Sequence, residues 1–409
     1  MYSFVQTPFI IGTFICVIGT MPSAFAAGEH KQILLDVAND KFTPAWEVSH
    51  KEWGGEKWSV KLRSLHGGKQ EGVQVIDVDN GVMTFTIVPT RGFGVWKAKV
   101  GDLRLGWDSP VTEIVSPAFI DLNNRGGLGW LDGFGGWMVR AGIASVGAPG
   151  MDGVPLNLHG NIDHTPASYV DVRYEGGKEP KLVFKGVVND TQMFGPNLQL
   201  KAEISTPIGK PEITFDDTIT NLSDAPQEFE SLYHTNFGPP LLVAGAEFIA
   251  AVSKVSPRDA RALEGDLVDW NKYTGPHQPG YTEQVYLMEL QGDKNGNTST
   301  MLKSADGTKA AVMDFNIKEL PAFSLWKNEA PSRTGYVTGL EPATNFPYPR
   351  PVERSAGRLN VLRGGESHHA TLVVRALTSK TEVTAAAEAI AKLQKSEPAV
   401  LKTPLNEQK

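Results

Sequence analysis

Runs in which apolar and polar residues alternate recur along almost the whole chain, and they constrain its fold more than any other feature. A period of two is the period of a β-strand with one buried and one solvated face. Glycine, proline, asparagine and aspartate separate the runs, as in turns between antiparallel strands. No stretch alternates strands with long helices, which counts against a doubly wound fold. The clearest runs are 81–88, 198–204, 213–220, 310–315, 335–340 and 369–375.

We therefore predict an all-β fold of antiparallel sheets with a short C-terminal helix. The helix is expected over about residues 380–395, where an Ala-rich segment has apolar residues at helical spacing and follows a capping Ser379 or Thr381. The tail after Glu397 is expected to be loose. The stretch 126–150 is rich in glycine and tryptophan, and we expect it to be loop because glycine weakens both helices and strands.

The first 27 residues carry no charged side chain. An apolar run from Phe9 to Ile18 is followed by small residues up to Ala27, which is typical of a cleaved secretory signal and too short to span a bilayer. The n-region lacks a basic residue, and an uncleaved anchor is the alternative. We expect residues 1–27 to be a signal peptide, residues 28–409 to be one β-sandwich domain, and the mature protein to be periplasmic or secreted without stable membrane insertion. Cys16 is the only cysteine, so the mature chain would have neither a disulfide nor a thiolate site.

The composition excludes some partners. The formal charge of −7 argues against a nucleic acid, whose phosphates would be repelled. No Gly-x-Ser-x-Gly elbow, Walker loop or complete dinucleotide fingerprint is present, so the sequence calls for no nucleotide cofactor.

Two residues far apart in the sequence form the leading catalytic hypothesis. His234 follows the strand-like run 229–233, and Glu341 follows the run 336–340 and precedes Pro342. We expect both to lie at strand ends, where a side chain can face a cleft. Core packing of the histidine and a surface ion pair of the glutamate are the alternatives. Opening a sugar ring needs such a pair, one group to take the proton of the anomeric hydroxyl and one to protonate the ring oxygen.

Other polar residues are candidates for binding. His159, Asp163 and His164 are close in sequence; they could bind a metal with His234 or Glu341, although this spacing favours hydrogen bonds to sugar hydroxyls.

Arg91 and Arg140 stand beside glycines and aromatic residues, a combination that suits a polyhydroxylated ligand. The tryptophans of that region could equally be core residues. The adjacent pair Asp216 and Asp217 cannot share one site, because neighbouring residues of a strand point to opposite faces.

Several motifs together resemble the galactose mutarotase-like superfamily, that is, aldose 1-epimerase and its relatives. The similarity runs through most of the chain after residue 90, and more specifically it resembles a bacterial branch known only as a domain of unknown function. It is carried by the hairpin 91–110, by Leu158-His159-Gly160, by 213–221 with its turn at 223–226, by Tyr233-His234-Thr235-Asn236-Phe237 and by Leu340-Glu341-Pro342-x-Thr344.

The resemblance implies a β-supersandwich, with His234 as general acid and Glu341 as general base of an anomer-interconverting isomerase. It implies a small-molecule carbohydrate as ligand, no cofactor and no metal. On this basis substrate binding is assigned to His159, Arg140, Arg91, Asn236 and His164. The sequence departs from the family in that Thr235-Asn236 replaces Pro-Tyr after the histidine. The family's Asn-Arg pair could be Asn124-Arg125, with Arg140 or Arg91 as its substitute.

Two alternatives remain open on the same fold. One is a carbohydrate-binding protein that keeps the cleft without catalysis. The other is a sugar lyase or isomerase, assisted by a metal at His159 and His164. A shared sandwich does not decide among these chemistries.

Overall fold

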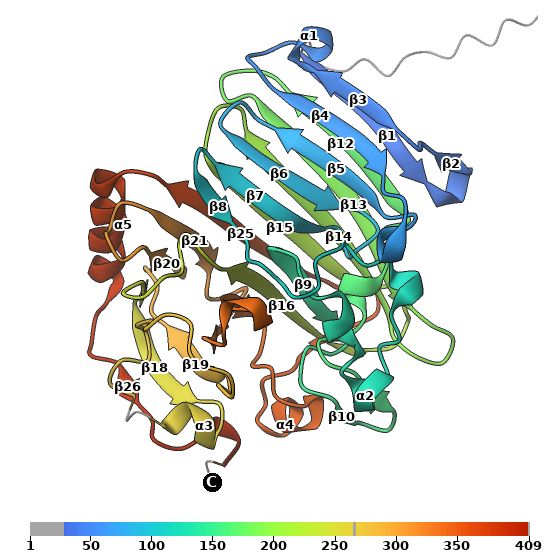
Figure 1. Cartoon of the computed structure of the whole chain (residues 1–409). Helices are drawn as coiled ribbons and strands as arrows, with labels where there is room; N and C mark the ends of the chain where they lie inside the picture. The colour runs from blue at the N-terminus through green and yellow to red at the C-terminus, as the bar shows by residue number, and fades with distance from the viewer. Residues whose placement is uncertain (1–27, 265–266, 408–409) are drawn as a thin grey trace, which may run out of the picture.

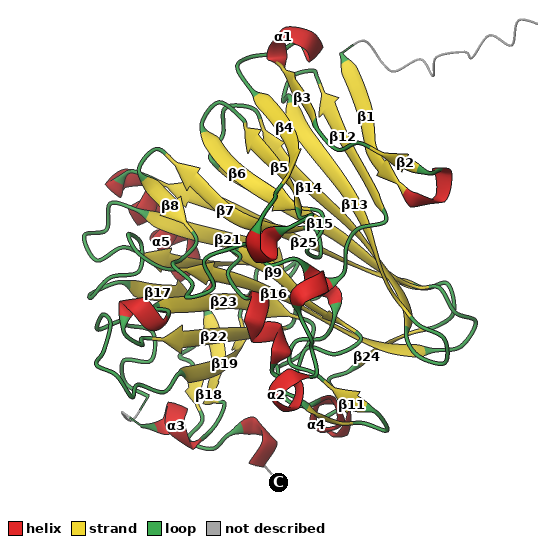
Figure 2. Cartoon of the chain, turned by 45° about the vertical axis from the view of Figure 1, so that its right-hand side comes forward, coloured by secondary structure: helices red, strands yellow, loops and turns green. Residues whose placement is uncertain are grey.

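Two large sheets stacked face to face make up most of the molecule (Figure 1). The computed structural model describes residues 28–264 and 267–407; the predicted signal segment 1–27 lies outside them. Helices are few and short beside the strands (Figure 2). The predicted all-β architecture is confirmed, and the six alternating runs are all strands. None of the helices in the described ranges is long and apolar enough to span a membrane.

The first sheet has ten strands, and its long strands alternate between buried and half-exposed residues. One face therefore packs in the core and the other meets solvent. In spatial order the strands are β17 (Glu247–Ala250), β20 (Asn297–Lys303), β21 (Ala310–Asn316), β25 (Ser367–Leu377), β15 (Glu212–Asn221), β14 (Asn197–Pro207), β13 (Lys181–Thr191), β12 (Tyr169–Glu175), β1 (Glu29–Asp36) and β2 (Lys41–Phe42).

The second sheet has fourteen strands, and all its pairs are antiparallel except that of β18 with β26. Twelve of them run in the order β26 (Ala399–Val400), β18 (Val252–Pro257), β19 (Gln284–Leu290), β22 (Ala322–Asn328), β23 (Val337–Ala343), β16 (Gln227–Phe237), β9 (Met138–Ile143), β7 (Gly94–Val100), β6 (Met83–Val88), β5 (Gln74–Asp79), β4 (Ser59–Ser64) and β3 (Trp46–Ser49). Beside this path, β24 (Asn360–Leu362) pairs with β16, β8 (Leu103–Leu105) pairs with β7, and β10 (Gly150–Met151) with β11 (Pro155–Leu156) forms a separate hairpin.

The longest described helix is the predicted one at the C-terminal end. It is α5 (Lys380–Leu393), and the Ser379 side chain caps it by accepting a hydrogen bond from the Glu382 backbone N–H. The other α-helices are α1 (His50–Trp53), α2 (Asn124–Gly127), α3 (Ala260–Leu263) and α4 (Arg350–Ser355). The 3₁₀ turns are Val37–Asn39, Gly68–Gln70, Pro117–Phe119, Gly129–Gly133, Ile162–His164, Ser332–Thr334 and Leu405–Glu407.

The centre of the larger sheet is buried on both faces. Every residue of β9 and β23 is buried, and so is β16 from Phe229 onward. The ten-stranded sheet packs against one face, and the segment that follows β8 packs against the other. Trp130 of the 3₁₀ turn Gly129–Gly133 packs with Val139 of β9 and lies beside His234 of β16. Polar side chains on these central strands therefore have to find partners inside the protein or face an internal cavity.

Two local expectations were wrong. The glycine-rich stretch 126–150 is not all loop, because it contains β9, where six consecutive residues are buried between β7 and β16. The tail after Glu397 is docked rather than loose. Val400 pairs with Val255 of β18, and the Ser256 hydroxyl donates to the carbonyl of Thr403. These tertiary contacts override the low intrinsic preference of both segments for regular structure.

Candidate functional site

His234 and Glu341 lie opposite each other on the neighbouring strands β16 and β23. The pairing of Leu232 with Ala343 and of Thr235 with Leu340 sets this register. Cross-strand neighbours on one face are in contact distance, and the His234 Nε2 and Glu341 Oε1 atoms are 3.3 Å apart. Their side chains are only 5% and 4% exposed. The structure thus brings together the two residues of the leading hypothesis.

Both residues stand inside strands, whereas the sequence placed them at strand ends. The sequence placed a strand end at Glu341, directly before Pro342. In the structure Pro342 is an internal residue of β23 and pairs with Phe323 of β22. Proline has no N–H to donate to a ladder. The ladder between β16 and β23 is interrupted between Leu232 and Thr235, opposite Pro342. The sheet accommodates the proline at the point where the two functional side chains meet.

A glycine makes room for the carboxylate. Gly339 lies two residues before Glu341, on the same face of β23. A Cβ atom at this position would lie 2.4 Å from Glu341 Oε1 and 3.1 Å from Cε1 of His234. Any side chain at position 339 would therefore push the pair apart.

Asn236 fixes the orientation of the imidazole. Its Oδ1 lies 2.7 Å from His234 Nδ1, and its Nδ2 donates to the backbone carbonyls of Gly136 and His234. Because the amide nitrogen is held by two carbonyls, the amide oxygen must accept from the Nδ1–H of His234. The Nε2 atom is then left to face Glu341. Asn236, which the sequence assigned to substrate binding, is fully buried behind the imidazole.

His159 is the third predicted side chain, after His234 and Glu341, that reaches the site. Its ring centroid is 5.4 Å from that of His234, and its Nδ1 lies 2.8 Å from the Val146 carbonyl. The backbone N–H of Val146 in turn donates to the buried carboxylate of Glu230. His159 is thereby held with its Nε2 atom available for a ligand.

The three side chains line a cavity of about 470 Å³. Aromatic rings surround His234, with centroid distances of 5.1 Å to Phe134, 5.3 Å to Trp326 and 6.0 Å to Trp130. Rings packed around a small polar centre suit the C–H faces of a sugar. Asn406 of the docked C-terminal tail also lines the cavity.

A polar chain on the cavity wall was missed by the sequence analysis. Glu283 accepts a hydrogen bond of 2.6 Å from the Trp326 indole N–H and forms an ion pair of 3.0 Å with Arg258. Arg258 also binds Asp259 and lines the same cavity. Arg258 and Asp259 follow β18, Glu283 directly precedes β19 and Trp326 belongs to β22, so no local motif marks them. Only the strand order brings them together.

Burial shifts the protonation of the pair in opposite directions. Burial, together with the negative charge of Glu283, raises the pKa of Glu341 to about 8. Burial, together with the neighbouring His159, lowers the pKa of His234 well below its usual value. At neutral pH the free site therefore carries one proton on the carboxyl group and a neutral imidazole.

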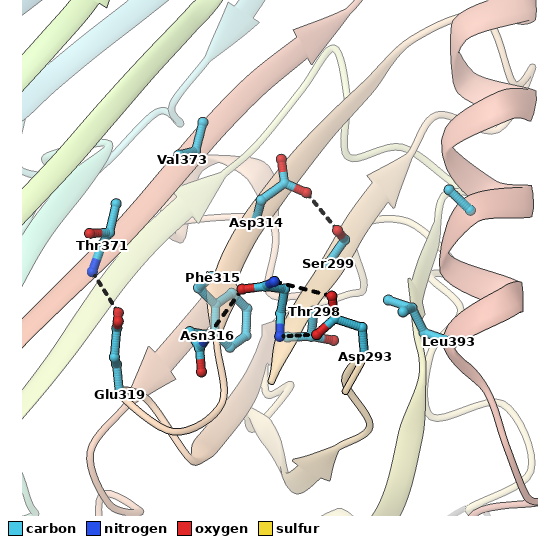
Figure 3. A pocket seen from close by; sticks show the side chains of 12 residues that line it. Asp293, Thr298, Ser299, Asp314, Phe315, Asn316, Glu319, Thr371, Val373 and Leu393 are labelled. Carbon is cyan, nitrogen blue, oxygen red and sulfur yellow. Dashed lines mark hydrogen bonds between the residues drawn. The ribbon is translucent and has the colours of Figure 1, made fainter. Parts of the chain in front are cut away.

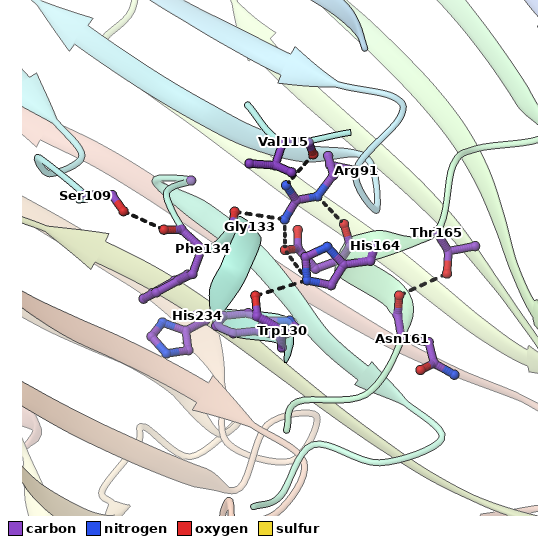
Figure 4. A network of polar contacts seen from close by, with 12 residues as sticks. Arg91, Ser109, Val115, Trp130, Gly133, Phe134, Asn161, His164, Thr165 and His234 are labelled. Carbon is purple, nitrogen blue, oxygen red and sulfur yellow. Dashed lines mark hydrogen bonds and ion pairs between the residues drawn. The ribbon is translucent and has the colours of Figure 1, made fainter. Parts of the chain in front are cut away.

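Arg91 and His164 do not line this cavity; they support its wall from behind. The Arg91 guanidinium donates to the carbonyls of Val115 and Gly133 and binds Asp163 at 2.6 Å. His164 Nε2 lies 3.3 Å from the carbonyl of Trp130. Figure 4 shows these groups converging on the backbone that carries Trp130 and Phe134. The Arg91 guanidinium and the His164 Nε2 atom are thus directed to the protein rather than to a ligand, whereas the buried His164 Nδ1 has no hydrogen-bond partner among the described residues.

Arg140 faces away from the cavity. It lies next to Val139, which is opposite His234 in the sheet, so alternation turns the arginine to the other face. There its guanidinium binds both oxygens of Asp217 at 2.6 and 2.9 Å and donates to the Phe93 carbonyl at 2.6 Å. The predicted contact of Arg140 with a substrate is not available in this arrangement.

The cluster His159, Asp163 and His164 does not converge on one point. His159 lines the cavity, whereas Asp163 and His164 belong to the Arg91 network, and the ring of Trp130 packs against both histidines. Within residues 28–264 and 267–407, no three His, Cys, Asp or Glu side chains are grouped to hold a metal ion.

A second hollow lies between α5 and the ten-stranded sheet, and its volume is about 500 Å³ (Figure 3). Its acidic groups are bonded within the protein: Asp314 to the hydroxyl of Ser299, and Asp293 to the amide of Asn297. Glu319 accepts from the backbone N–H of Thr371. The hollow offers satisfied surface groups rather than a reactive pair.

Comparison with solved structures identifies the class. The fold is that of galactose mutarotase-like proteins. A protein from Klebsiella pneumoniae described as a "putative aldose 1-epimerase" is 34% identical, with a TM-score of 0.90 over 93% of this chain and 100% of its own. A galactose mutarotase-like protein from Clostridium acetobutylicum (15% identity, TM-score 0.53, 78% of this chain and 98% of its own) shares the fold. So does a galactose 1-epimerase from Lactobacillus acidophilus (12%, 0.52, 79% and 100%).

The family itself follows from the sequence match. The chain belongs to the family described as Domain of unknown function (DUF4432), which matches residues 70–376. No curated protein matches the chain. The predicted resemblance to aldose 1-epimerase relatives is confirmed at the level of fold and family.

Proposed function

We propose that this protein is an aldose 1-epimerase that interconverts the two anomers of a sugar by opening and closing its ring. The observation that carries the proposal is the His234–Glu341 contact of 3.3 Å at a cavity walled by aromatic rings. The ring oxygen and the anomeric hydroxyl of a sugar are bonded to one carbon. An acid and a base that act on both must therefore be neighbours, as these two groups are.

Ring opening uses the pair with its proton on the imidazole. The Glu341 carboxylate takes the proton of the anomeric hydroxyl while His234 gives its Nε2 proton to the ring oxygen. The bond between the anomeric carbon and the ring oxygen breaks, and a carbonyl group forms. The carboxyl group is then protonated and the imidazole neutral.

Ring closure uses the opposite distribution of the same proton. After rotation about the C1–C2 bond, the hydroxyl group that was formed from the ring oxygen attacks the other face of the carbonyl carbon. His234 takes the proton of this hydroxyl, and Glu341 protonates the carbonyl oxygen, which becomes the new anomeric hydroxyl. The raised pKa of Glu341 and the lowered pKa of His234 favour this state in the free protein. One proton on the pair thus serves both halves of the cycle, and no proton has to be exchanged with solvent.

The neighbouring groups have supporting roles. His159 offers its Nε2 atom to a hydroxyl or to the developing charge, because its Nδ1 is bound to Val146. Asn236 is a positioning residue, since it keeps Nε2 of His234 toward Glu341. The rings of Trp130 and Trp326 would pack against the sugar.

Anomer exchange measured by NMR over a panel of reducing sugars tests the proposal. Wild-type protein should accelerate exchange of at least one sugar, and Glu341→Gln and His234→Gln should each slow it by roughly 10²–10⁴-fold. The exposed pair His66 and Glu71, 3.0 Å apart, provides a matched control, and Glu71→Gln should leave the rate unchanged. Sugar binding without acceleration in the wild type would instead indicate a carbohydrate-binding protein.

We further propose that the protein is exported, on the basis of the uncharged apolar segment at residues 9–18. Expression of the full chain followed by fractionation and N-terminal sequencing tests this part separately. A processed N-terminus close to residue 28 in the periplasm or medium is the expected result. An intact N-terminus on cytoplasmic protein would contradict it.

A further inference from the structure

Apolar side chains dominate the part of the cavity that surrounds the reacting pair. Leu128 and Leu131 are 37% and 39% exposed although they are large and apolar, and they stand on the segment that also carries Trp130. Further apolar side chains come from separate segments on the same cavity, namely Pro149, Leu158, Pro347 and Pro349. A ligand seated on His234 and Glu341 therefore meets hydrocarbon along much of its surface.

The polar groups on the wall are largely occupied by one another. Glu283 is bound to Trp326 and Arg258, and Arg258 is bound to Asp259. The hydroxyl of Tyr348 donates to the Arg258 carbonyl. Beyond the reacting pair, hydrogen-bonding capacity for a ligand comes from His159 Nε2, from the Asn406 side chain and from the exposed parts of Arg258, Asp259 and Glu283, whose side chains are 30%, 39% and 37% exposed.

The charges also exclude acidic sugars. Arg258 is the one cation on the cavity wall among the described residues, and the carboxylates of Asp259 and Glu283 neutralise it at 2.7 and 3.0 Å. The carboxyl group of Glu341 is a further acidic neighbour. A uronate or a sugar phosphate would bring negative charge to a wall that already has more acidic than basic groups.

We infer that the substrate is a neutral deoxy sugar, a ring in which hydrogen or a methyl group stands where a common aldose has a hydroxyl or hydroxymethyl group. This inference rests on the proposed function and names its substrate class. A methyl group against Leu128 and Leu131 is removed from water favourably. A hydroxyl at the same place gains no hydrogen bond from these two side chains.

Matched pairs of sugars that differ by one oxygen test the inference. The pairs are 6-deoxygalactose with galactose, 6-deoxymannose with mannose, and 2-deoxyribose with ribose, each followed by NMR exchange. The deoxy member of at least one pair should have a kcat/KM roughly 10- to 100-fold higher, the range that an apolar pocket achieves for one such group. Equal or lower values for the deoxy member in every pair would overturn the inference and leave the proposed function intact.

A variant of the wall links the preference to these residues. Leu131→Asn supplies hydrogen-bonding groups at an exposed position. For the sugar pair with the strongest preference, it should reduce the ratio of the kcat/KM of the deoxy sugar to that of its hydroxylated counterpart several-fold. Leu222, 48% exposed at the end of β15, is the control, and Leu222→Asn should leave the ratio unchanged. An unchanged ratio in Leu131→Asn contradicts the assignment to this wall.

Failure of the proposed function can be distinguished from failure of this inference by measuring binding instead of catalysis. If no sugar is accelerated, calorimetric titration with the same pairs still decides the substrate class. Tighter binding of the deoxy member supports it, and equal or weaker binding, or none, overturns it.

Discussion

Two buried polar clusters lie close together in this molecule and differ in how their hydrogen bonds are satisfied. In the cluster behind the wall, Arg91 uses its donors on Asp163 and on the carbonyls of Asp163, Val115 and Gly133. In the cavity, the Oε1 atom of Glu341 accepts no hydrogen bond from the described residues, although His234 is 3.3 Å away.

This difference distinguishes a cluster that stabilises the structure from a cluster that can react with a ligand. A buried ion pair with all its partners holds the surrounding backbone in one arrangement. A buried carboxyl group without a bonded partner has a shifted pKa and keeps bonding capacity for a ligand. Residue types alone do not distinguish the two clusters, because each combines a histidine and an acidic residue.

The largest expected effect is on stability, in the supporting cluster. Arg91→Ala should lower the free energy of unfolding by about 3–5 kcal/mol, because it leaves the Asp163 carboxylate buried and unpaired. Arg63, in an exposed pair with Asp77, is the control, and Arg63→Ala should cost about 0–1 kcal/mol. Urea unfolding followed by circular dichroism measures both. Similar losses in the two variants would remove the distinction between the clusters.

Glu341→Gln should act in the opposite direction. The folded-state pKa of about 8 lies above the ordinary value of 4.5, so this group's contribution to stability is complete below the ordinary pKa and declines as pH rises through 8. Removing the ionisable group should therefore stabilise the fold by on the order of 1–3 kcal/mol at pH 8. Unfolding at pH 5 and pH 8 gives the comparison. A destabilised variant at pH 8 would show that the carboxyl group also supports the structure.

The same pair sets the pH dependence of the proposed activity. One proton is required on the pair, so the rate should fall about tenfold per pH unit above about 8, where Glu341 loses it. On the acid side the rate should persist to well below pH 6.5, because burial lowers the pKa of His234. Exchange rates corrected for the spontaneous reaction provide the profile. A sharp optimum near pH 6.5 would be inconsistent with this assignment.

Asn236→Asp should sharpen the contrast with a smaller effect. A carboxylate next to the Nδ1–H stabilises the imidazolium form of His234 and so raises its pKa. The pH below which the exchange rate declines, the acid limb of the pH–rate profile, should therefore rise by about one pH unit or more. The exposed Asn360 serves as the control, and Asn360→Asp should not move the limb. An unmoved limb in Asn236→Asp would mean that the amide does not act on His234.

The smallest effect is expected at His164. It supports the Trp130 carbonyl through a 3.3 Å contact and is not part of the cavity lining. His164→Gln can keep one such bond, and KM should change by less than about threefold. A tenfold or larger increase in KM would return this residue to the set that contacts substrate.

Sequence could predict what depends on local pattern. Alternation predicted six strands, distributed over both sheets, and the Ser379 cap with its Ala-rich segment predicted α5. His234 and Glu341 were found because each stands beside strand-like residues in motifs of the family. Their contact, however, depends on the register of β16 with β23, which no local pattern specifies.

The errors share one physical cause, namely partners that arrive from distant segments. Arg91 and Arg140 looked available because nothing near them is acidic, yet Asp163 lies 72 residues and Asp217 lies 77 residues further along the chain. The wall residues Arg258, Glu283 and Trp326 come from three strands or strand ends. The tail after Glu397 lacks periodicity and is ordered only by its edge position beside β18.

The placement of His234 and Glu341 on two hydrogen-bonded central strands has a consequence for loss of activity. Sites built on loops can fail while the rest of a protein stays folded, because loops open at low free-energy cost. Here the reactive geometry belongs to the most deeply covered part of the larger sheet. Heat or urea should therefore abolish catalysis and strand structure in one transition, with no inactive but folded state before it.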